Sequence, residues 1–301
     1  MSASDSYQLL DFGAGRKLER FGPYILDRVS PAAAGARRQR PELWSTATAR
    51  FERGADGQGI WQENEPLATP WNLWFDGFSL ELKLNEFGHL GVFPEQVDNW
   101  RWIAEQVRRA ERPKVLNLFA YTGASTLAAA AVGAKVVHVD AAANVVAWAR
   151  RNAAASGLAT APIRWIVDDA VKFVRRELKR GQKYDAVLLD PPAYGHGPAG
   201  QSWKLDAHLD ELVAMCFELC RGRERFVLLT CHSGGLATAG SLLRYARERQ
   251  PTSTTELVAA STDMELVAAG GSRLHCGAAV RWSERGSSQT FKANHAREKH
   301  H

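Results

Sequence analysis

A carboxylate, two prolines and an aromatic ring follow one another at residues 190–194, directly after the apolar run 184–189. A carboxylate can accept hydrogen bonds from an amine, and a tyrosine ring can stack on a flat base. Pro191 and Pro192 donate no hydrogen bond, so they end a strand and leave nearby carbonyl oxygens free for a ligand. The motif therefore predicts that Asp190 and Tyr194 hold a flat polar substrate. An Asp-Pro turn that only closes a strand is the alternative.

The elements around this motif predict where it lies. A run that is apolar throughout, such as 184–189, is typical of a central parallel strand buried on both faces. Strands are also expected at 114–120, 135–139 and 163–167, and helical segments follow each of them. Open sheets of this kind bind ligands outside the carboxyl ends of their strands. The sequence therefore predicts an α/β fold with a doubly wound parallel sheet.

Further polar residues stand at the expected strand ends. The loop 121–125 contains a single glycine, Gly123, whereas a dinucleotide fingerprint needs three. Asp140 ends the second strand, where it can bind both ribose hydroxyls or cap the next helix. Asp168 and Asp169 end the third strand, where they can accept from an adenine amine or begin a helix with favourable charge. The pattern favours a ligand with an adenosine and no phosphates.

In this order and spacing, the motifs resemble those of class I S-adenosylmethionine-dependent methyltransferases, and most of all the large-subunit ribosomal RNA methyltransferase group. The resemblance covers about residues 88–235 and includes the segment before the sheet. It implies S-adenosylmethionine as cofactor, a base of RNA as substrate and a Rossmann-like seven-stranded sheet with an antiparallel closing strand. The cofactor contacts that it implies are Gln96, Asn117, Phe119, Ala120, Tyr121, Thr122, Gly123, Asp140, Asp168, Asp169 and Asp190.

The expected catalytic residues are Asp190, Pro191, Pro192, Tyr194 and Cys231. An exocyclic amine needs only acceptors such as Asp190, whereas carbon 5 of a pyrimidine needs a thiolate that adds to carbon 6. Cys231 follows the expected strand 225–230, on the same side of the sheet as Asp190. Some relatives have a nucleophilic cysteine in a Ser-Cys-Ser-Gly pattern, and alignment on Ser-Gly puts His232 at that position. Cys231 as nucleophile, Cys231 as buried core and His232 as general base all stay open.

Residues 1–88 differ in character from residues 89–301, which we assign to the methyltransferase domain. Short alternating segments predict a small antiparallel β subdomain. Its tryptophans and the basic cluster 37–40 form either an RNA surface or a small core with a solvated loop. At the other end, a strand pair around 256–260 and 273–282 predicts the closing hairpin. A polar, basic tail follows from residue 287. Its His295, His300 and His301 could suggest a metal site, but a frayed tail is favoured.

The length, composition and charge of the chain limit the class of protein that it can be. The chain has 301 residues, 45% of them hydrophobic, a net charge of +5 and a pI near 9.1, which favours a polyanionic partner. The four cysteines lack metal-site spacing, and no apolar run has membrane-spanning length. The polar first residues also lack the apolar region of a signal peptide, so a cytoplasmic enzyme is expected. A methyltransferase for small molecules or protein side chains, and a non-catalytic RNA-associated module, are the alternatives.

Overall fold

The computed structural model describes residues 7–284 except 56, 197–199, 201, 224, 233 and 252–256. Three sequence predictions fall outside these residues: the tail from 287 with its histidines, Ser233, and Glu256 at the predicted start of the closing hairpin. Within the part of the chain that is described, no helix combines the length and apolar composition needed to cross a membrane.

A seven-stranded sheet forms the centre of the larger part of the molecule. Its order is β10-β9-β8-β11-β14-β16-β15, with the first five strands parallel and β16 antiparallel to both neighbours. Side chains that are apolar on both faces explain why β8, β11 and β14 occupy the middle. The predicted doubly wound sheet with a closing hairpin is confirmed. The strands are β8 Lys114–Leu118, β9 Lys135–Asp140, β10 Ile163–Val167, β11 Ala186–Leu189, β14 Phe226–Cys231, β15 Leu257–Val267 and β16 Arg273–Glu284.

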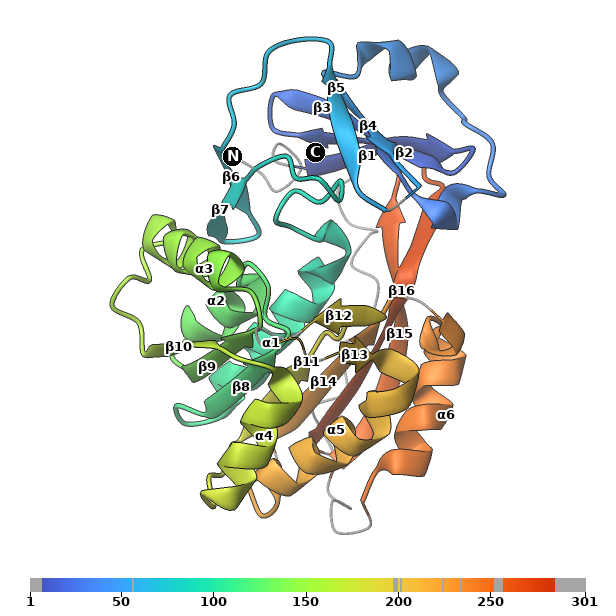
Figure 1. Ribbon diagram of the computed structural model, residues 1–301. Helices are drawn as coiled ribbons and strands as arrows, with labels where there is room; N and C mark the ends of the chain where they lie inside the picture. The colour runs from blue at the N-terminus through green and yellow to red at the C-terminus, as the bar shows by residue number, and fades with distance from the viewer. Residues whose placement is uncertain are drawn as a thin grey trace, which may run out of the picture.

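Helices cover both faces of this sheet (Figure 1). Alternate strand residues enter two cores, for example Val187 on the face covered by α4, α5 and α6, and Leu188 on the face covered by α1, α2 and α3. The helices are α1 Val97–Arg109, α2 Ala124–Ala130, α3 Ala143–Ala155, α4 Ala170–Lys179, α5 Leu205–Cys220 and α6 Ala239–Arg249. Short 3-10 turns are η2 Pro31–Ala33, η3 Pro41–Thr46, η4 Pro94–Gln96 and η5 Gly234–Leu236.

The N-terminal sheet has five strands in sequence order: β1 Tyr7–Gly13, β2 Arg16–Phe21, β3 Tyr24–Val29, β4 Ala49–Arg53 and β5 Gly59–Glu63. It is antiparallel as predicted except between β3 and β4, which are parallel. The connection through η2 and η3 is long enough for such a crossover. Trp44 is buried there, donates through Nε1 to Asp11 at 2.7 Å and lies under the Arg38 guanidinium at 3.7 Å. Trp44 therefore belongs to the core of the sheet, and the Arg38 guanidinium covers its ring.

Two contacts hold the N-terminal sheet above the larger part. The tip of the β15–β16 hairpin reaches β1, where the Ala269 amide donates to the Leu9 carbonyl at 3.0 Å (Figure 1). A second hairpin, β6 Trp71–Phe75 and β7 Phe78–Leu82, joins the N-terminal sheet to α3. It shares an apolar core with that sheet, and the rings of Tyr7 and Phe75 lie 5.7 Å apart between centroids. On α3, the Asn152 side chain accepts from the Glu81 amide at 2.8 Å, and Trp148 donates to the Glu81 carbonyl at 3.0 Å. The space beneath the sheet is thereby fixed in shape.

Candidate active site

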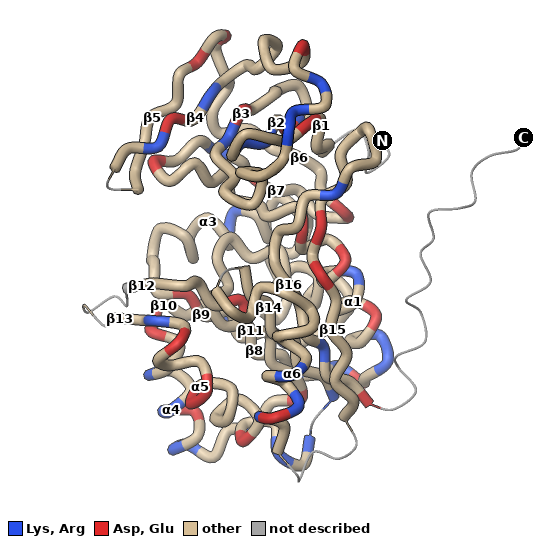
Figure 2. Tube along the Cα trace, turned by 90° about the vertical axis from the view of Figure 1, so that its right-hand side faces the viewer, with Lys and Arg blue, Asp and Glu red and all other residues tan. Residues whose placement is uncertain are grey.

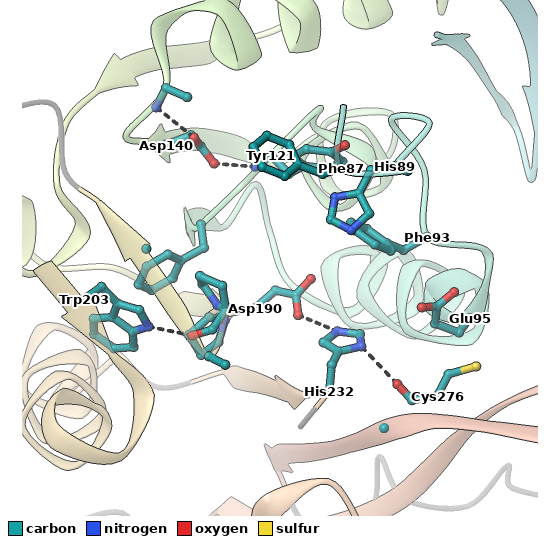
Figure 3. A pocket seen from close by; sticks show the side chains of 18 of the residues that line it. Phe87, His89, Phe93, Glu95, Tyr121, Asp140, Asp190, Trp203, His232 and Cys276 are labelled. Atoms are coloured by element: carbon teal, nitrogen blue, oxygen red, sulfur yellow. Dashed lines mark hydrogen bonds and ion pairs between the residues drawn. The ribbon is translucent and has the colours of Figure 1, made fainter. Parts of the chain in front are cut away.

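A cavity of about 750 Å³ lies between the N-terminal sheet and the carboxyl ends of the parallel strands. Its floor carries the strand-end carboxylates Asp140, Asp168, Asp169 and Asp190, as the sequence predicts. Figure 3 labels two of them, Asp140 and Asp190. A volume of this size is within the range of pockets that hold small ligands and cofactors. A ligand that is held by these strand-end carboxylates would therefore bind in this cavity.

Three residues of the loop after β8 have left-handed backbone conformations: Phe119 with φ 55°, Tyr121 with φ 48° and Gly123 with φ 93°. Such conformations are strained in residues with a side chain, so surrounding contacts must enforce them. Asp140 accepts from the Tyr121 amide at 2.8 Å, and the Thr122 hydroxyl donates to the Gly91 carbonyl at 2.6 Å. The loop is therefore held in one shape at the edge of the cavity.

Below the loop, side chains support it without facing the main cavity. Asn117 is buried and donates to the Thr126 hydroxyl at 2.9 Å, which lies 2.9 Å from Nδ1 of His138. Burial, with a smaller effect of the Arg150 cation, lowers the pKa of His138 to about 3, so its ring is neutral. A hollow of about 40 Å³ adjoins the cavity here and shares Phe119, Tyr121 and Asp190 with it. Five further predicted contacts line only the hollow: Gln96, Asn117, Ala120, Thr122 and Gly123.

Asp140, Asp168 and Asp169 can bind a ligand and also stabilise the starts of the helices that follow them; the geometry is compatible with both functions. Asp169 caps α4 by accepting from the Lys172 amide at 2.9 Å, and Asp168 pairs with Arg176, yet both line the cavity. Asp140 also accepts from the Ala142 amide at 3.0 Å. Burial raises the pKa of Asp140, and its backbone hydrogen bonds oppose that rise. These carboxylates are thus fixed in place before a ligand arrives.

Asp190 lies at the end of β11, within a set of hydrogen-bond donors. Its Oδ1 accepts from the Thr230 hydroxyl and from Nε2 of His232 at 2.9 Å, and its Oδ2 accepts from Nε2 of Gln96 at 3.1 Å. Burial favours the neutral carboxyl, but the His232 charge and these hydrogen bonds outweigh it and lower the pKa of Asp190. A carboxylate has about four acceptor positions, and three are taken, so one on Oδ2 remains for a ligand.

His232 is clamped between two acceptors (Figure 3). Nε2 faces Asp190, and Nδ1 lies 3.1 Å from the Cys276 carbonyl, so both ring nitrogens must carry protons to make both bonds. Burial opposes the charge, but Asp190, Glu95 and the Cys276 carbonyl raise the pKa of His232 to about 9. Cys276 is the extra residue of a bulge in β16, and bulges often redirect groups beside functional sites. His232 is therefore an imidazolium at neutral pH.

The thiol of Cys231 does not reach the cavity. The residue has 0% exposure and is absent from the cavity lining, and burial together with the Asp190 charge raises its pKa to about 12. A nucleophilic cysteine must be a thiolate that its substrate can reach. The expectation that Cys231 is catalytic is therefore not supported, because the strand-end side chain points into the core. His232, the next residue, lines the cavity instead.

Tyr194 also departs from its predicted place. Its side chain is 75% exposed and does not line the cavity, whereas its neighbours Ala193 and Gly195 do. Side chains alternate along the short strand β12 Tyr194–His196, which pairs with β13 Ser202–Lys204, so Tyr194 faces outward. Trp203 takes the inner position: its Nε1 donates to the Pro192 carbonyl at 2.7 Å, and its ring centroid is 4.8 Å from that of Phe119.

Sequence reasoning missed both Trp203 and the residues of the N-terminal sheet that line the cavity. Lys17, Arg28, Phe51 and Arg53 come from β2, β3 and β4 and face the strand ends. Their only local signal was alternation in short strands, which does not say what the strands cover.

Comparison with known proteins agrees with this geometry. A family model described as S-adenosylmethionine-dependent methyltransferase matches residues 15–215. The crystal structure of a SAM-dependent methyltransferase from Agrobacterium tumefaciens is 38% identical, with a TM-score of 0.86 over 94% of this chain and 91% of that one.

Two relatives act on ribosomal RNA according to their names. Ribosomal RNA large subunit methyltransferase I of Aeromonas hydrophila is 33% identical over 161 residues, which are 53% of this chain and 36% of the relative. Ribosomal RNA large subunit methyltransferase K/L of Shewanella frigidimarina is 30% identical over 193 residues, 62% of this chain and 26% of the relative. This chain thus spans about a third or less of these relatives. The extent of the family match establishes that the chain belongs to the S-adenosylmethionine-dependent methyltransferases.

Proposed function

We propose that this protein transfers a methyl group from S-adenosylmethionine to an exocyclic amine of an RNA base, in a ribosomal RNA and in the cytoplasm. The observation that carries the proposal is Asp190, an ionised carboxylate in the cavity with one acceptor position left. Of the two cysteines nearest to it, Cys231 is buried and Cys276 has its pKa raised to about 12, chiefly by burial. Carbon 5 chemistry would lack its thiolate, whereas amine chemistry needs none.

The cavity suits this cofactor. Asp140 faces it from the end of β9, where it can accept from ribose hydroxyls, and the pair Asp168–Asp169 can accept from an adenine amine. A loop with one glycine, where a dinucleotide fingerprint has three, fits a ligand without phosphates. S-adenosylmethionine supplies a methyl group on a positively charged sulfur, which makes the methyl electrophilic. We assign residues 89–301 to the methyltransferase domain, which binds the cofactor, and residues 1–88 to a subdomain that contacts the substrate.

The protein's own contribution is orientation and proton acceptance. Asp190 Oδ2 accepts one amine hydrogen and thereby aims the nitrogen lone pair, while His232, Thr230 and Gln96 keep the carboxylate from turning. Methyl transfer would form a nitrogen–carbon bond as the sulfur–methyl bond breaks, with S-adenosylhomocysteine as the leaving group. The proton that the amine must lose leaves through Asp190 to solvent. Pro191 and Trp203 fill the wall beside the amine and exclude water.

Three observations support RNA as substrate, and a fourth supports the cytoplasm as location. The two relatives named above are ribosomal RNA methyltransferases, the net charge is +5, and basic residues lie along β2, β3 and β4 (Figure 2). The four cysteines are all free, as is usual in a reducing compartment.

Transfer of tritiated methyl groups to ribosomal RNA from a strain lacking this gene tests the proposal. We expect wild-type protein to label the RNA, and Asp190→Asn to reduce kcat by about 100-fold or more. Asp210→Asn, a surface carboxylate on α5 paired with Arg249, is the matched control and should stay active. No labelling of RNA, with labelling of a small molecule or protein instead, would overturn the substrate. Full activity of Asp190→Asn would overturn the role of Asp190.

A further inference from the structure

The loop between β7 and η4 places an aromatic ring in the cavity wall. Phe87 lines the cavity although its residue is 45% exposed. The loop is fixed locally, because Oδ1 of Asn85 accepts from the amides of both Phe87 and His89 at 2.9 Å. A large apolar ring held rigid and open to solvent is suited to stacking on a flat ligand.

The N-terminal sheet fixes the same loop from the other side. The Gly59 amide donates to the Glu86 carbonyl at 2.7 Å, and the Trp61 ring nitrogen donates to the Asn85 carbonyl at 2.8 Å. Gly88 has φ 75°, and a Cβ there would lie 2.6 Å from the Phe51 ring, so the loop and β4 are in close contact. Phe87 is therefore part of the sheet's underside, and its position is set before a ligand binds.

Positive charge accompanies this ring. Lys17 lies 3.0 Å from Glu19, and Arg28 donates to the same carboxylate at 2.8 Å. Glu19 is fully buried, and Arg28 is 6% exposed, with its guanidinium bonded to Glu19 and to the Gly88 carbonyl. Two positive charges thus share one negative charge at the cavity wall, which leaves a net positive charge beside Lys17. Arg53 lines the cavity from the end of β4, opposite Gly59 in the strand pair. Burial, with smaller effects of the Arg28, Arg53 and Lys17 charges, lowers the pKa of His89, another residue of the cavity wall, to about 4.

Phe87, His89 and Tyr121 line the same cavity as Asp190 and His232, and Figure 3 draws the first three above the last two. The ring and the cations thus form a roof over the carboxylate that we propose receives the amine. Aromatic stacking combined with neutralisation of the backbone is how proteins hold single strands. A double helix does not fit into a cavity of about 750 Å³, so the target base must be unpaired or turned out of its stack.

We propose that this roof, formed by Phe87, Lys17 and Arg53, binds the nucleotide next to the methylated one. Phe87 stacks on the neighbouring base, and the cations hold the phosphates on either side. The inference rests on the proposed RNA methyltransferase function and adds to it a second binding site, supplied by the N-terminal sheet.

The roof can be tested by measuring RNA binding in the presence of S-adenosylhomocysteine (SAH), the demethylated cofactor. The probe is a short fluorescein-labelled single-stranded RNA of mixed sequence, and the readout is fluorescence anisotropy. We expect Phe87→Ala to weaken RNA binding by roughly 5- to 150-fold and Phe87→Trp to restore it. Arg53→Gln should lower the slope of log Kd against log salt by about 0.7. Trp74→Ala, which removes a half-exposed ring on β6 outside the cavity, and Arg109→Gln on α1 are the matched controls.

Two further measurements separate the outcomes. The SAH affinity of each variant, measured by calorimetry, should equal that of the wild type; a loss of SAH affinity with unchanged RNA affinity would assign the cations to the cofactor and overturn the proposal. If wild-type protein methylates RNA while the roof variants bind and methylate it equally well, the roof is wrong and the proposed function stands. If wild-type protein transfers no methyl group to RNA, the proposed function itself fails.

Discussion

Replacing His232 with glutamine removes the positive charge that faces Asp190. The imidazolium donates to the Asp190 carboxylate at 2.9 Å and to the Cys276 carbonyl at 3.1 Å, whereas glutamine can replace one donor and no charge. Hydrogen bonds to charged groups contribute about 1.5–3 kcal/mol. The two side chains are 31% and 35% exposed, so screening reduces the expected loss to about 1–2 kcal/mol. That corresponds to a fall in kcat/KM of roughly 5- to 30-fold at neutral pH.

The pH dependence gives a sharper readout. The folded protein raises the pKa of His232 to about 9. The ion pair with Asp190 therefore contributes fully to stability below the pKa that the histidine has in the unfolded chain, and it is lost as the pH rises through about 9. The charged groups that act on the ring are Asp190 and Glu95, and its uncharged neighbours include the Cys276 carbonyl and the Gln96 amide. The thiols of Cys231 and Cys276, with pKa values of about 12, stay neutral in this range. Wild-type kcat/KM should therefore decline near pH 9.

The His232→Gln variant should lack this alkaline decline. His208→Gln is the control and should keep the wild-type profile, because this half-buried histidine on α5 contacts the Lys204 backbone and does not line the cavity. Methyl transfer to ribosomal RNA, measured from pH 5 to 10, is the assay. A variant that keeps both the wild-type rate and the decline near pH 9 would refute the reasoning, because another group would then be responsible.

Three more predictions follow from the site. Cys231→Ala should retain most methyl transfer, and RNA containing 5-fluorocytidine should form no covalent adduct detectable on a denaturing gel; such an adduct would restore the thiolate mechanism. Asp140→Ala, which removes the acceptor of two backbone amides at 2.8 and 3.0 Å, should raise the Kd for SAH at least about tenfold by calorimetry; an unchanged Kd would contradict its assignment. Gly91→Ala, whose Cβ would lie 2.3 Å from the Trp148 ring, should lower the free energy of unfolding in urea by about 2 kcal/mol or more, whereas Gly133→Ala, with a similar φ and open space, should cost about 1 kcal/mol.

The sheet and its acidic strand ends could be predicted because their signal is local. Strands such as Ala186–Leu189 are apolar on both faces, and parallel strands bring their carboxyl ends to one edge whatever the connecting loops do. Asp140, Asp168, Asp169 and Asp190 consequently line one cavity, as expected.

Side-chain direction and distant partners could not be predicted in the same way. Cys231 and His232 are adjacent in sequence, and only the packing of β14 against β16 decides which of them faces the cavity. Tyr194 faces outward because strand alternation in β12 puts Gly195 inside. The cations of the roof carry no sequence signal of their own, since their position depends on how the N-terminal sheet folds over the strand ends.

The central claim is that Asp190 receives an exocyclic amine of an RNA base. Mass spectrometry of nucleosides tests it most directly, after wild-type protein and trideuteromethyl-labelled S-adenosylmethionine have acted on ribosomal RNA from a strain lacking this gene. We expect one modified nucleoside with the label on an exocyclic nitrogen, and its disappearance with Asp190→Asn. Label on carbon 5 of a pyrimidine or on a ribose oxygen, or the absence of label from RNA, would contradict the account.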